Sequence, residues 1–194
     1  DIYPRNNDLN IGLVDTRGTR AGNFAVENAD TVICIGSRLS MMTTGYSYNL
    51  FLRGAKKFIV VDIDVEEHKK GTVHIDKIIN ADAKNFISKL KNIKLKDIRA
   101  WRDKCLYWKQ KWPMINKDHE DDSNGISKFA FIGVLNKHLQ QDSVVTTDAG
   151  ATTEIPMQAL NFTSSRQRYL GSAAQCEMGY AIPAAIGASI GRDK

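Results

Sequence analysis

Two stretches toward the end of the sequence carry residue types and spacings that suit the binding of an anion. In the first, the β-branched run Val144-Val145-Thr146-Thr147 is followed at once by Asp148-Ala149-Gly150. This order is typical of a strand, a turn and the start of a helix. The first N–H groups of a helix lack partners inside the helix, and the helix dipole adds partial positive charge at the same end. The turn is therefore predicted to cradle an anion, and a phosphate best of all.

The second stretch, residues 171–188, is rich in small residues. It reads GSAAQCEMGYAIPAAIGA, which is not the pattern of an ordinary amphipathic helix. Small side chains let a backbone approach a ligand or a neighbouring element closely. The alternative interpretation is a tightly packed Ala/Gly helix that binds no ligand.

Together the two stretches resemble the start of the diphosphate-binding domain of thiamine-diphosphate enzymes, in the acetolactate synthase branch. In that family a strand ends in Asp-x-Gly, and a Gly-x-Met-Gly-aromatic-x-Leu/Ile-Pro-Ala-Ala-Ile/Leu-Gly run follows. Here residues 176–187 read CEMGYAIPAAIG. The resemblance implies that Met178 is the wedge beneath the bent cofactor and that the Cys176 carbonyl accepts a hydrogen bond from the cofactor's amino group. The cofactor-binding residues that it implies in this region are Gly150, Ala151, Thr152 and Gly179.

The chain departs from this pattern at two places. Cys176 stands where the family has glycine, but a main-chain acceptor does not depend on the side chain. Ala151-Thr152 replaces the Gln-His of acetolactate synthases, which puts the substrate in doubt rather than the cofactor. The magnesium site, Gly-Asp-Gly with a downstream Asn, would begin beyond Lys194, and the activating glutamate would precede Asp1. We therefore expect the middle part of a longer enzyme, unable to turn over substrate alone.

The elements in the first half of the chain alternate between helices and strands. Phe24 and Ala25 lie on the apolar face of a predicted helix that Thr19 could cap. Apolar runs predict strands at residues 31–35, 58–64 and 73–80, and a helix follows at residues 84–90. The alternation predicts an α/β fold with a Rossmann-like parallel sheet, whose ligands bind beyond the carboxyl ends of the strands.

These strand ends resemble the central domain of the same family, although no G-x-G-x-x-G fingerprint occurs. The matches, in order, are Arg17-Gly18-Thr19, Ala29-Asp30, Gly36-Ser37-Arg38, Asp62-Ile63-Asp64 and Ala81-Asp82-Ala83. In acetolactate synthases these positions hold FAD. The nucleotide contacts that the resemblance implies are Gly36, Arg38, Asp62 and Asp82.

Flavin-binding synthases continue this pattern with Phe-Asp-Asp-Arg, whereas this chain has Leu39-Ser40-Met41-Met42, so FAD itself stays open. Two structural alternatives also stay open. Asp62 and Asp82 could simply cap the turns that follow their strands. Arg38 could pair with one of those two acids.

Residues 96–125 are predicted to connect two domains. Three tryptophans and Cys105 share one face of a helix predicted at residues 93–112, which indicates core packing. Pro113 ends that helix, and in the acidic loop that follows, solvated charge around His119 is a better interpretation than a metal site. The central domain is then residues 1–95. Residues 126–194, opening with a helix at residues 126–139, start the diphosphate-binding domain as a second parallel α/β domain.

Composition narrows the class of protein. With 42% hydrophobic and 25% charged residues in 194, the chain has the make-up of a soluble globular protein, without a membrane-spanning run or a signal peptide. The net charge of +5 comes largely from residues 89–117, where no aromatic side chains are placed to stack on bases, so nucleic acid is not an expected partner. Cys34, Cys105 and Cys176 are far apart, which favours a reducing, cytoplasmic setting without disulfide or metal.

We therefore expect part of a thiamine-diphosphate- and Mg²⁺-dependent enzyme that decarboxylates a 2-keto acid and transfers the acyl carbanion to an acceptor. The resemblance implies a homodimer or homotetramer. The same motifs serve decarboxylases, oxidases and acyl-CoA lyases, so the identities of the 2-keto acid and the acceptor stay open. The alternative is a non-catalytic, adenine-nucleotide-binding module of the Rossmann-like type.

Overall fold

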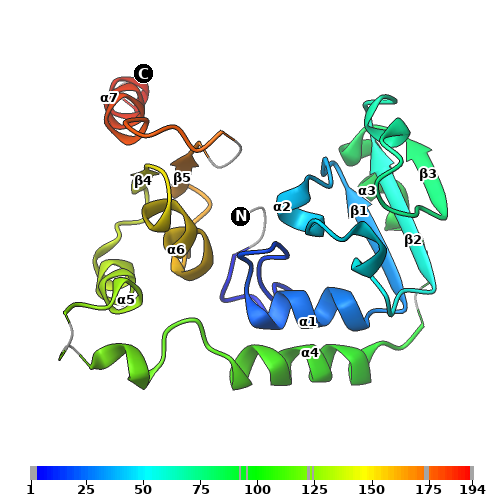
Figure 1. The fold of residues 1–194 in the computed structure, drawn as a ribbon, viewed down its shortest axis with the longest axis horizontal. Helices are drawn as coiled ribbons and strands as arrows, with labels where there is room; N and C mark the ends of the chain where they lie inside the picture. The colour runs from blue at the N-terminus through cyan, green and yellow to red at the C-terminus, as the bar shows by residue number, and fades with distance from the viewer. Residues whose placement is uncertain are drawn as a thin grey trace. The chain divides into compact units, whose positions relative to one another are not determined.

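The computed structural model describes residues 4–91, 93–94, 96–121, 123, 125–172 and 175–192. The chain divides into two compact units (Figure 1): a central unit of residues 11–111, and a terminal unit of residues 1–10 and 112–194. Each contains a parallel sheet with helices packed on it, so the predicted α/β class is confirmed.

The central unit is built around a sheet in the order β1-β2-β3, with all strands parallel. Its elements in chain order are α1 (Arg20–Asn28), β1 (Thr31–Ile35), α2 (Met41–Thr44), η1 (Tyr48–Leu50), β2 (Lys57–Asp62), η2 (Glu67–Lys69), β3 (Lys77–Asn80), α3 (Ala83–Leu90) and α4 (Arg99–Lys111). Phe58, Val60 and Val61 of the middle strand are buried, and each such side chain contributes roughly 1.5–3 kcal/mol on burial.

Helices α1 and α4 lie side by side (Figure 1) and bury the aromatic stripe that the sequence pointed out. The Thr19 hydroxyl accepts a hydrogen bond from the Gly22 N–H at 3.1 Å, so the predicted cap of α1 is confirmed. The rings of Phe24 and Trp108 meet edge to face, 5.8 Å between centroids, and Cys105 is buried beside them. The middle of the predicted stripe is therefore core, whereas Trp101 is only partly buried and Trp112 follows the end of α4.

Two predicted boundaries in this unit were wrong. Helix α4 begins at Arg99 rather than at residue 93, because the Asp97 carboxylate accepts a hydrogen bond from the Arg99 N–H at 2.9 Å and starts the helix there. Strand β3 begins at Lys77 rather than at residue 73. The Phe58 N–H at the start of β2 donates to the Asp76 carboxylate at 2.7 Å, so strand pairing starts only after that residue.

The terminal unit holds a second parallel sheet, β4 beside β5. Its elements are η3 (Lys117–Glu120), α5 (Lys128–His138), β4 (Val144–Thr147), α6 (Ala151–Ala159), β5 (Arg168–Gly171) and α7 (Ala181–Arg192). In Figure 1 the two strands lie between α6 and α7, and α5 packs against α6 around Ile132, Ala159 and Leu160. Strand β5 was not identified in the sequence.

The N-terminal residues join this unit through Arg5. Its guanidinium donates to the carbonyl oxygens of Met157 and Gln158 in the last turn of α6. Cations are favourable at this end of a helix, where the carbonyl groups lack partners. Burial lowers the pKa of Arg5 to about 10.

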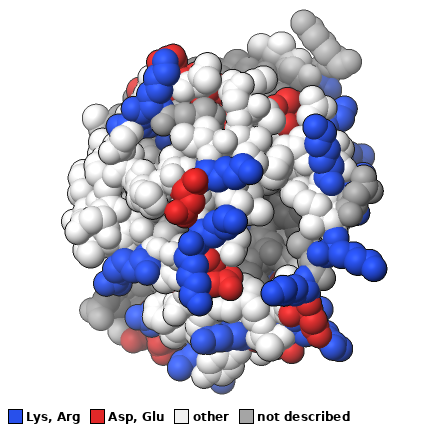
Figure 2. Space-filling view, turned by 90° about the vertical axis from the view of Figure 1, so that its right-hand side faces the viewer, with Lys and Arg blue, Asp and Glu red and all other residues white. Residues whose placement is uncertain are grey.

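Figure 2 shows how charge is distributed on one face of the molecule. On the face in Figure 2, Lys and Arg side chains stand singly or beside Asp and Glu. In the part of the chain that the structure describes, no helix combines the length and the apolar character needed to cross a membrane.

Candidate functional site

The turn between β4 and α6 forms the first part of the site. Gly150, the N-cap of α6, has φ +65° and ψ −142°, a backbone conformation that residues with a Cβ rarely adopt. Within the described ranges, the N–H groups of Gly150, Ala151 and Thr152 make no hydrogen bond. The next N–H, that of Thr153, already donates to the Gly150 carbonyl at 2.9 Å. Successive free N–H groups at a helix N-terminus suit an anion such as phosphate.

A hydroxyl network beneath this turn holds it in place. Thr147 Oγ1 lies 2.6 Å from the Tyr169 hydroxyl and 3.3 Å from Thr153 Oγ1, and the Tyr169 hydroxyl donates to the Thr153 carbonyl at 3.2 Å. Burial raises the pKa of Tyr169, which keeps the phenol protonated and able to donate. The network fastens the end of β4 and Tyr169 of β5 to the first turn of α6.

The loop before α7 forms the second part. Cys176 has φ +56°, a left-handed conformation that costs a non-glycine residue roughly 1–2 kcal/mol. Gly179 has φ +91°. Met178, between them, is 89% exposed, so its side chain projects from the loop. Ala173 and Ala174 lie outside the described residues.

Asp148 brings the two parts together. Its carboxylate oxygens accept hydrogen bonds from the Gly179 N–H, at 2.8 and 2.9 Å, and one of them lies 3.5 Å from the Ala181 nitrogen. The predicted residues Gly150 and Gly179 therefore belong to one site. The sequence analysis treated Asp148 only as a turn residue and missed this role. The sequence signal for this role was the position of Asp148, a carboxylate directly after the strand that leads into the predicted anion cradle.

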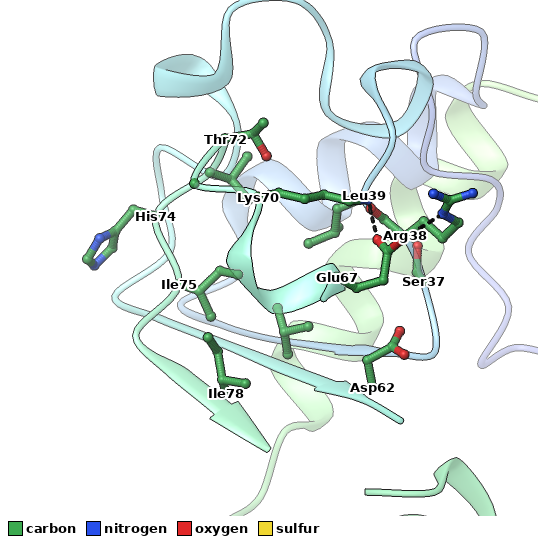
Figure 3. A pocket seen from close by; sticks show the side chains of 13 residues that line it. Ser37, Arg38, Leu39, Asp62, Glu67, Lys70, Thr72, His74, Ile75 and Ile78 are labelled. Carbon is green, nitrogen blue, oxygen red and sulfur yellow. Dashed lines mark hydrogen bonds and ion pairs between the residues drawn. The ribbon is translucent and has the colours of Figure 1, made fainter. Parts of the chain in front are cut away.

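A second candidate site lies in the central unit, in a pocket of about 470 Å³ (Figure 3). It is lined by Ser37, Arg38, Leu39, Val60, Asp62, Glu67, Lys70, Gly71, Thr72, Val73, His74, Ile75 and Ile78. Of the four predicted nucleotide contacts, Arg38 and Asp62 line it. Gly36, with φ +60°, comes two residues before Arg38. Asp82 caps α3, where it accepts a hydrogen bond from the Asn85 N–H at 2.9 Å. The Asp62 carboxylate accepts a hydrogen bond from the Asp64 N–H at 2.9 Å, so both acids make the turn contacts that the structural alternative predicted.

The cations of this pocket are already paired with an acid. Glu67 lies 3.0 Å from Arg38 Nε and also pairs with the Lys70 ammonium (Figure 3). Lys70 in turn donates to the Arg38 carbonyl at 2.6 Å. The hydrogen bond from Lys70, together with the attraction of both cations, holds the pKa of Glu67 below its ordinary value. The sequence analysis did not identify Glu67 or Lys70, because both lie in a polar loop without a motif.

The lining of the pocket suits a nucleoside. Val60, Ile75 and Ile78 offer an apolar surface for a base, and the Asp62 carboxylate is an acceptor for ribose hydroxyls. Leu39, where flavin-binding synthases have an aromatic residue, also lines the pocket. These residues could therefore hold an adenine nucleotide.

The acidic loop around His119 has a local structural role. His119 Nδ1 accepts a hydrogen bond from the Asn116 N–H at 3.1 Å, and its ring stacks on Phe129, 4.8 Å between centroids. Among the residues that the structure describes, no group of three or more His, Cys, Asp and Glu side chains could hold a metal ion. Asp122, which the sequence analysis placed in this cluster, is outside those residues.

Comparisons with known proteins found matches to both halves of the chain. Residues 1–90 match the family described as thiamine pyrophosphate enzyme, central domain. The chain is 31% identical to the probable acetolactate synthase large subunit of Methanocaldococcus jannaschii, over 98% of the chain and 33% of that protein. It is also 31% identical to acetolactate synthase 2, chloroplastic, of Nicotiana tabacum, over 98% of the chain and 29% of that protein. The chain thus spans about a third of the length of the curated relatives it matches.

Proposed function

We propose that this chain, which belongs to the thiamine pyrophosphate enzymes and is acetolactate-synthase-like, forms part of an enzyme that decarboxylates a 2-keto acid. The acyl unit is then transferred to an acceptor. The observation that carries this proposal is the junction of the two motifs. A row of free N–H groups at Gly150, Ala151 and Thr152 adjoins the loop of Met178 through the hydrogen bonds of Asp148.

Each residue of the junction has a role in this proposal. The N–H groups at the start of α6 bind the diphosphate, since they are free and lie at the positive end of a helix. Met178, with its exposed side chain, would support the bound cofactor, and the Cys176 carbonyl would accept a hydrogen bond from the amino group of its pyrimidine. When bound, thiamine diphosphate supplies a nucleophilic carbon and an electron sink. The Mg²⁺ ligands and the activating carboxylate come, in this proposal, from segments outside these residues, so the chain alone is inactive.

The central unit has a supporting role. We assign it to binding of an adenine nucleotide, with Arg38 and Asp62 as contacts and Gly36 at the strand end. FAD is one such nucleotide. The proposed domain division is residues 1–95, 96–125 and 126–194. The proposed assembly is a homodimer or homotetramer in the cytoplasm.

The proposal is tested on the full protein that carries this chain. Calorimetric titration with thiamine diphosphate and Mg²⁺ should give saturable binding. Met178→Ala should lower kcat by at least about tenfold, because the bent conformation loses its support, while diphosphate affinity changes far less. Met41→Ala is the matched control, since Met41 is also exposed, at 49%, but lies in α2 of the central unit. No binding to the intact, folded protein would overturn the catalytic proposal.

A second function is favoured by the central pocket. Its apolar surface and the acceptor Asp62 would also serve a non-catalytic adenine-nucleotide-binding module. Titration with ADP separates the two. Binding of ADP without binding of thiamine diphosphate would favour the module, whereas binding of both would favour the enzyme.

A further inference from the structure

We propose that Asp148 is a positioning residue that couples the diphosphate cradle at the start of α6 to the loop that carries Met178. The inference rests on the proposed function, because it assigns Asp148 a task in that same site. It goes further by naming a side chain that holds the turn at Gly150 and the loop of Met178 in place relative to each other.

The geometry of Asp148 suits this coupling. Along the chain, Asp148 is joined to Gly150 through Ala149, whose N–H also donates to the Asp148 carboxylate at 2.9 Å. Across space, the same carboxylate receives the Gly179 N–H at 2.8 and 2.9 Å. A shift of the Met178 loop relative to the cradle would therefore have to break the contact between Asp148 and Gly179.

A carboxylate is well matched to this position. Helix α7 has no acidic residue in its own first turn. Asp148 supplies that charge from the turn after β4, next to the Gly179 N–H and 3.5 Å from the Ala181 nitrogen. Negative charge at the N-terminus of a helix is stabilising, and hydrogen bonds to an ionised acceptor are the stronger kind.

The loop has few other anchors at this end. The 89% exposure of Met178 means that packing of this side chain does not hold the loop. On the far side, the Cys176 N–H donates to the Ser172 carbonyl at 2.6 Å, which ties the loop to the end of β5. Asp148 makes hydrogen bonds between this loop and the turn that contains the cradle, so its removal should loosen the loop without disturbing the N–H groups of α6.

Hydrogen exchange on the ligand-free protein tests the coupling directly. In Asp148→Ala, the amide of Gly179 should exchange on the order of tenfold faster, because it loses its acceptor. Asp148→Asn retains a side-chain oxygen and should preserve most of the protection. Asp142→Asn is the control, since Asp142 pairs with Arg192 at the opposite end of α7. Unchanged exchange at Gly179 in Asp148→Ala would overturn the proposal.

A pair of ligands separates positioning from a general loss of structure. Inorganic pyrophosphate occupies the cradle alone, whereas thiamine diphosphate needs the cradle and the Met178 loop together. In Asp148→Ala we expect the Kd for pyrophosphate to stay within about twofold and the Kd for thiamine diphosphate to rise on the order of tenfold, with recovery in Asp148→Asn. Equal weakening of both ligands would overturn the coupling, and tighter binding of both would show that Asp148 acts only by charge repulsion.

Failure of the proposed function has a different signature. If the wild-type protein binds pyrophosphate but not thiamine diphosphate, the cofactor assignment is wrong. The exchange of the Gly179 amide still decides whether Asp148 holds the loop. If Asp148→Ala does not fold, the exchange of the Gly179 amide is measured in Asp148→Asn instead. We expect its protection to be lower than in the wild type. Protection equal to that in the Asp142→Asn control would count against the proposal.

Discussion

The two candidate sites lie beyond the carboxyl ends of parallel strands, one in each unit, yet they present charge in opposite ways. In the central pocket, Arg38 and Lys70 both pair with the single acid Glu67. At the start of α6, the positive groups are backbone N–H groups that, among the described residues, have no partner. A site made of side chains can satisfy itself in the absence of ligand. A site made of helix N–H groups cannot, because the backbone geometry holds them apart from any acceptor.

The largest expected effect comes from changing the backbone of the cradle. Gly150 and Gly187 both leave open space where a Cβ would be placed, but only Gly150 of the two has a positive φ. Gly150→Ala should weaken pyrophosphate binding by about tenfold, since a Cβ in that conformation costs on the order of 1–3 kcal/mol and rotates the N–H groups away. Titration calorimetry measures the effect. Gly187→Ala, in α7, should leave the Kd unchanged, and an equal loss in both variants would contradict the backbone explanation.

A smaller effect is expected in the central pocket, in the opposite direction. Glu67→Gln removes the acid that neutralises Arg38 and Lys70, so ADP should bind roughly threefold more tightly at low salt, and the gain should shrink at high salt. Glu66→Gln is the matched control, because Glu66 pairs with Lys69 at 2.6 Å in the same loop without lining the pocket. Weaker ADP binding in Glu67→Gln would mean that Glu67 itself contacts the ligand.

The same residue gives a pH dependence. Because the pKa of Glu67 is lowered in the folded protein, its ion pairs stabilise the fold above the ordinary carboxyl pKa. That stabilisation is lost as the pH falls through the lowered value. The difference in Tm between the wild type and Glu67→Gln should therefore narrow on acidification. A difference that stays constant with pH would contradict the assignment of the ion pairs.

An effect on stability rather than on binding is expected in the Met178 loop. Cys176 has a left-handed backbone at φ +56°, so Cys176→Gly should raise the free energy of unfolding by about 1 kcal/mol. Urea denaturation measures this change. Cys176→Ala removes the thiol but keeps the strain, and should leave the stability near that of the wild type. If both variants gained equally, the thiol rather than the backbone would be the source of the strain.

Several elements could be predicted because their causes are local. The Thr19 cap, strand β1 and the buried face of α4 each follow from neighbouring residues whose spacing matches one period of structure. Strand β5 escaped detection because residues 168–171 combine one charged, one aromatic, one apolar and one glycine residue without alternation. This segment forms a strand because it pairs with β4, and the same pairing places Tyr169 beside Val145.

The sequence by itself determined the parallel α/β class, the turn at Gly150 and the small-residue stretch around Met178, since these depend on residues adjacent in the chain. Only the tertiary structure decided which side chains meet. It paired Arg38 with Glu67, assigned Asp82 to a helix cap and placed the Asp148 carboxylate on the Gly179 N–H. A carboxylate binds whichever donor the fold brings within about 3 Å, and that distance depends on the packing of whole elements rather than on the residues beside it.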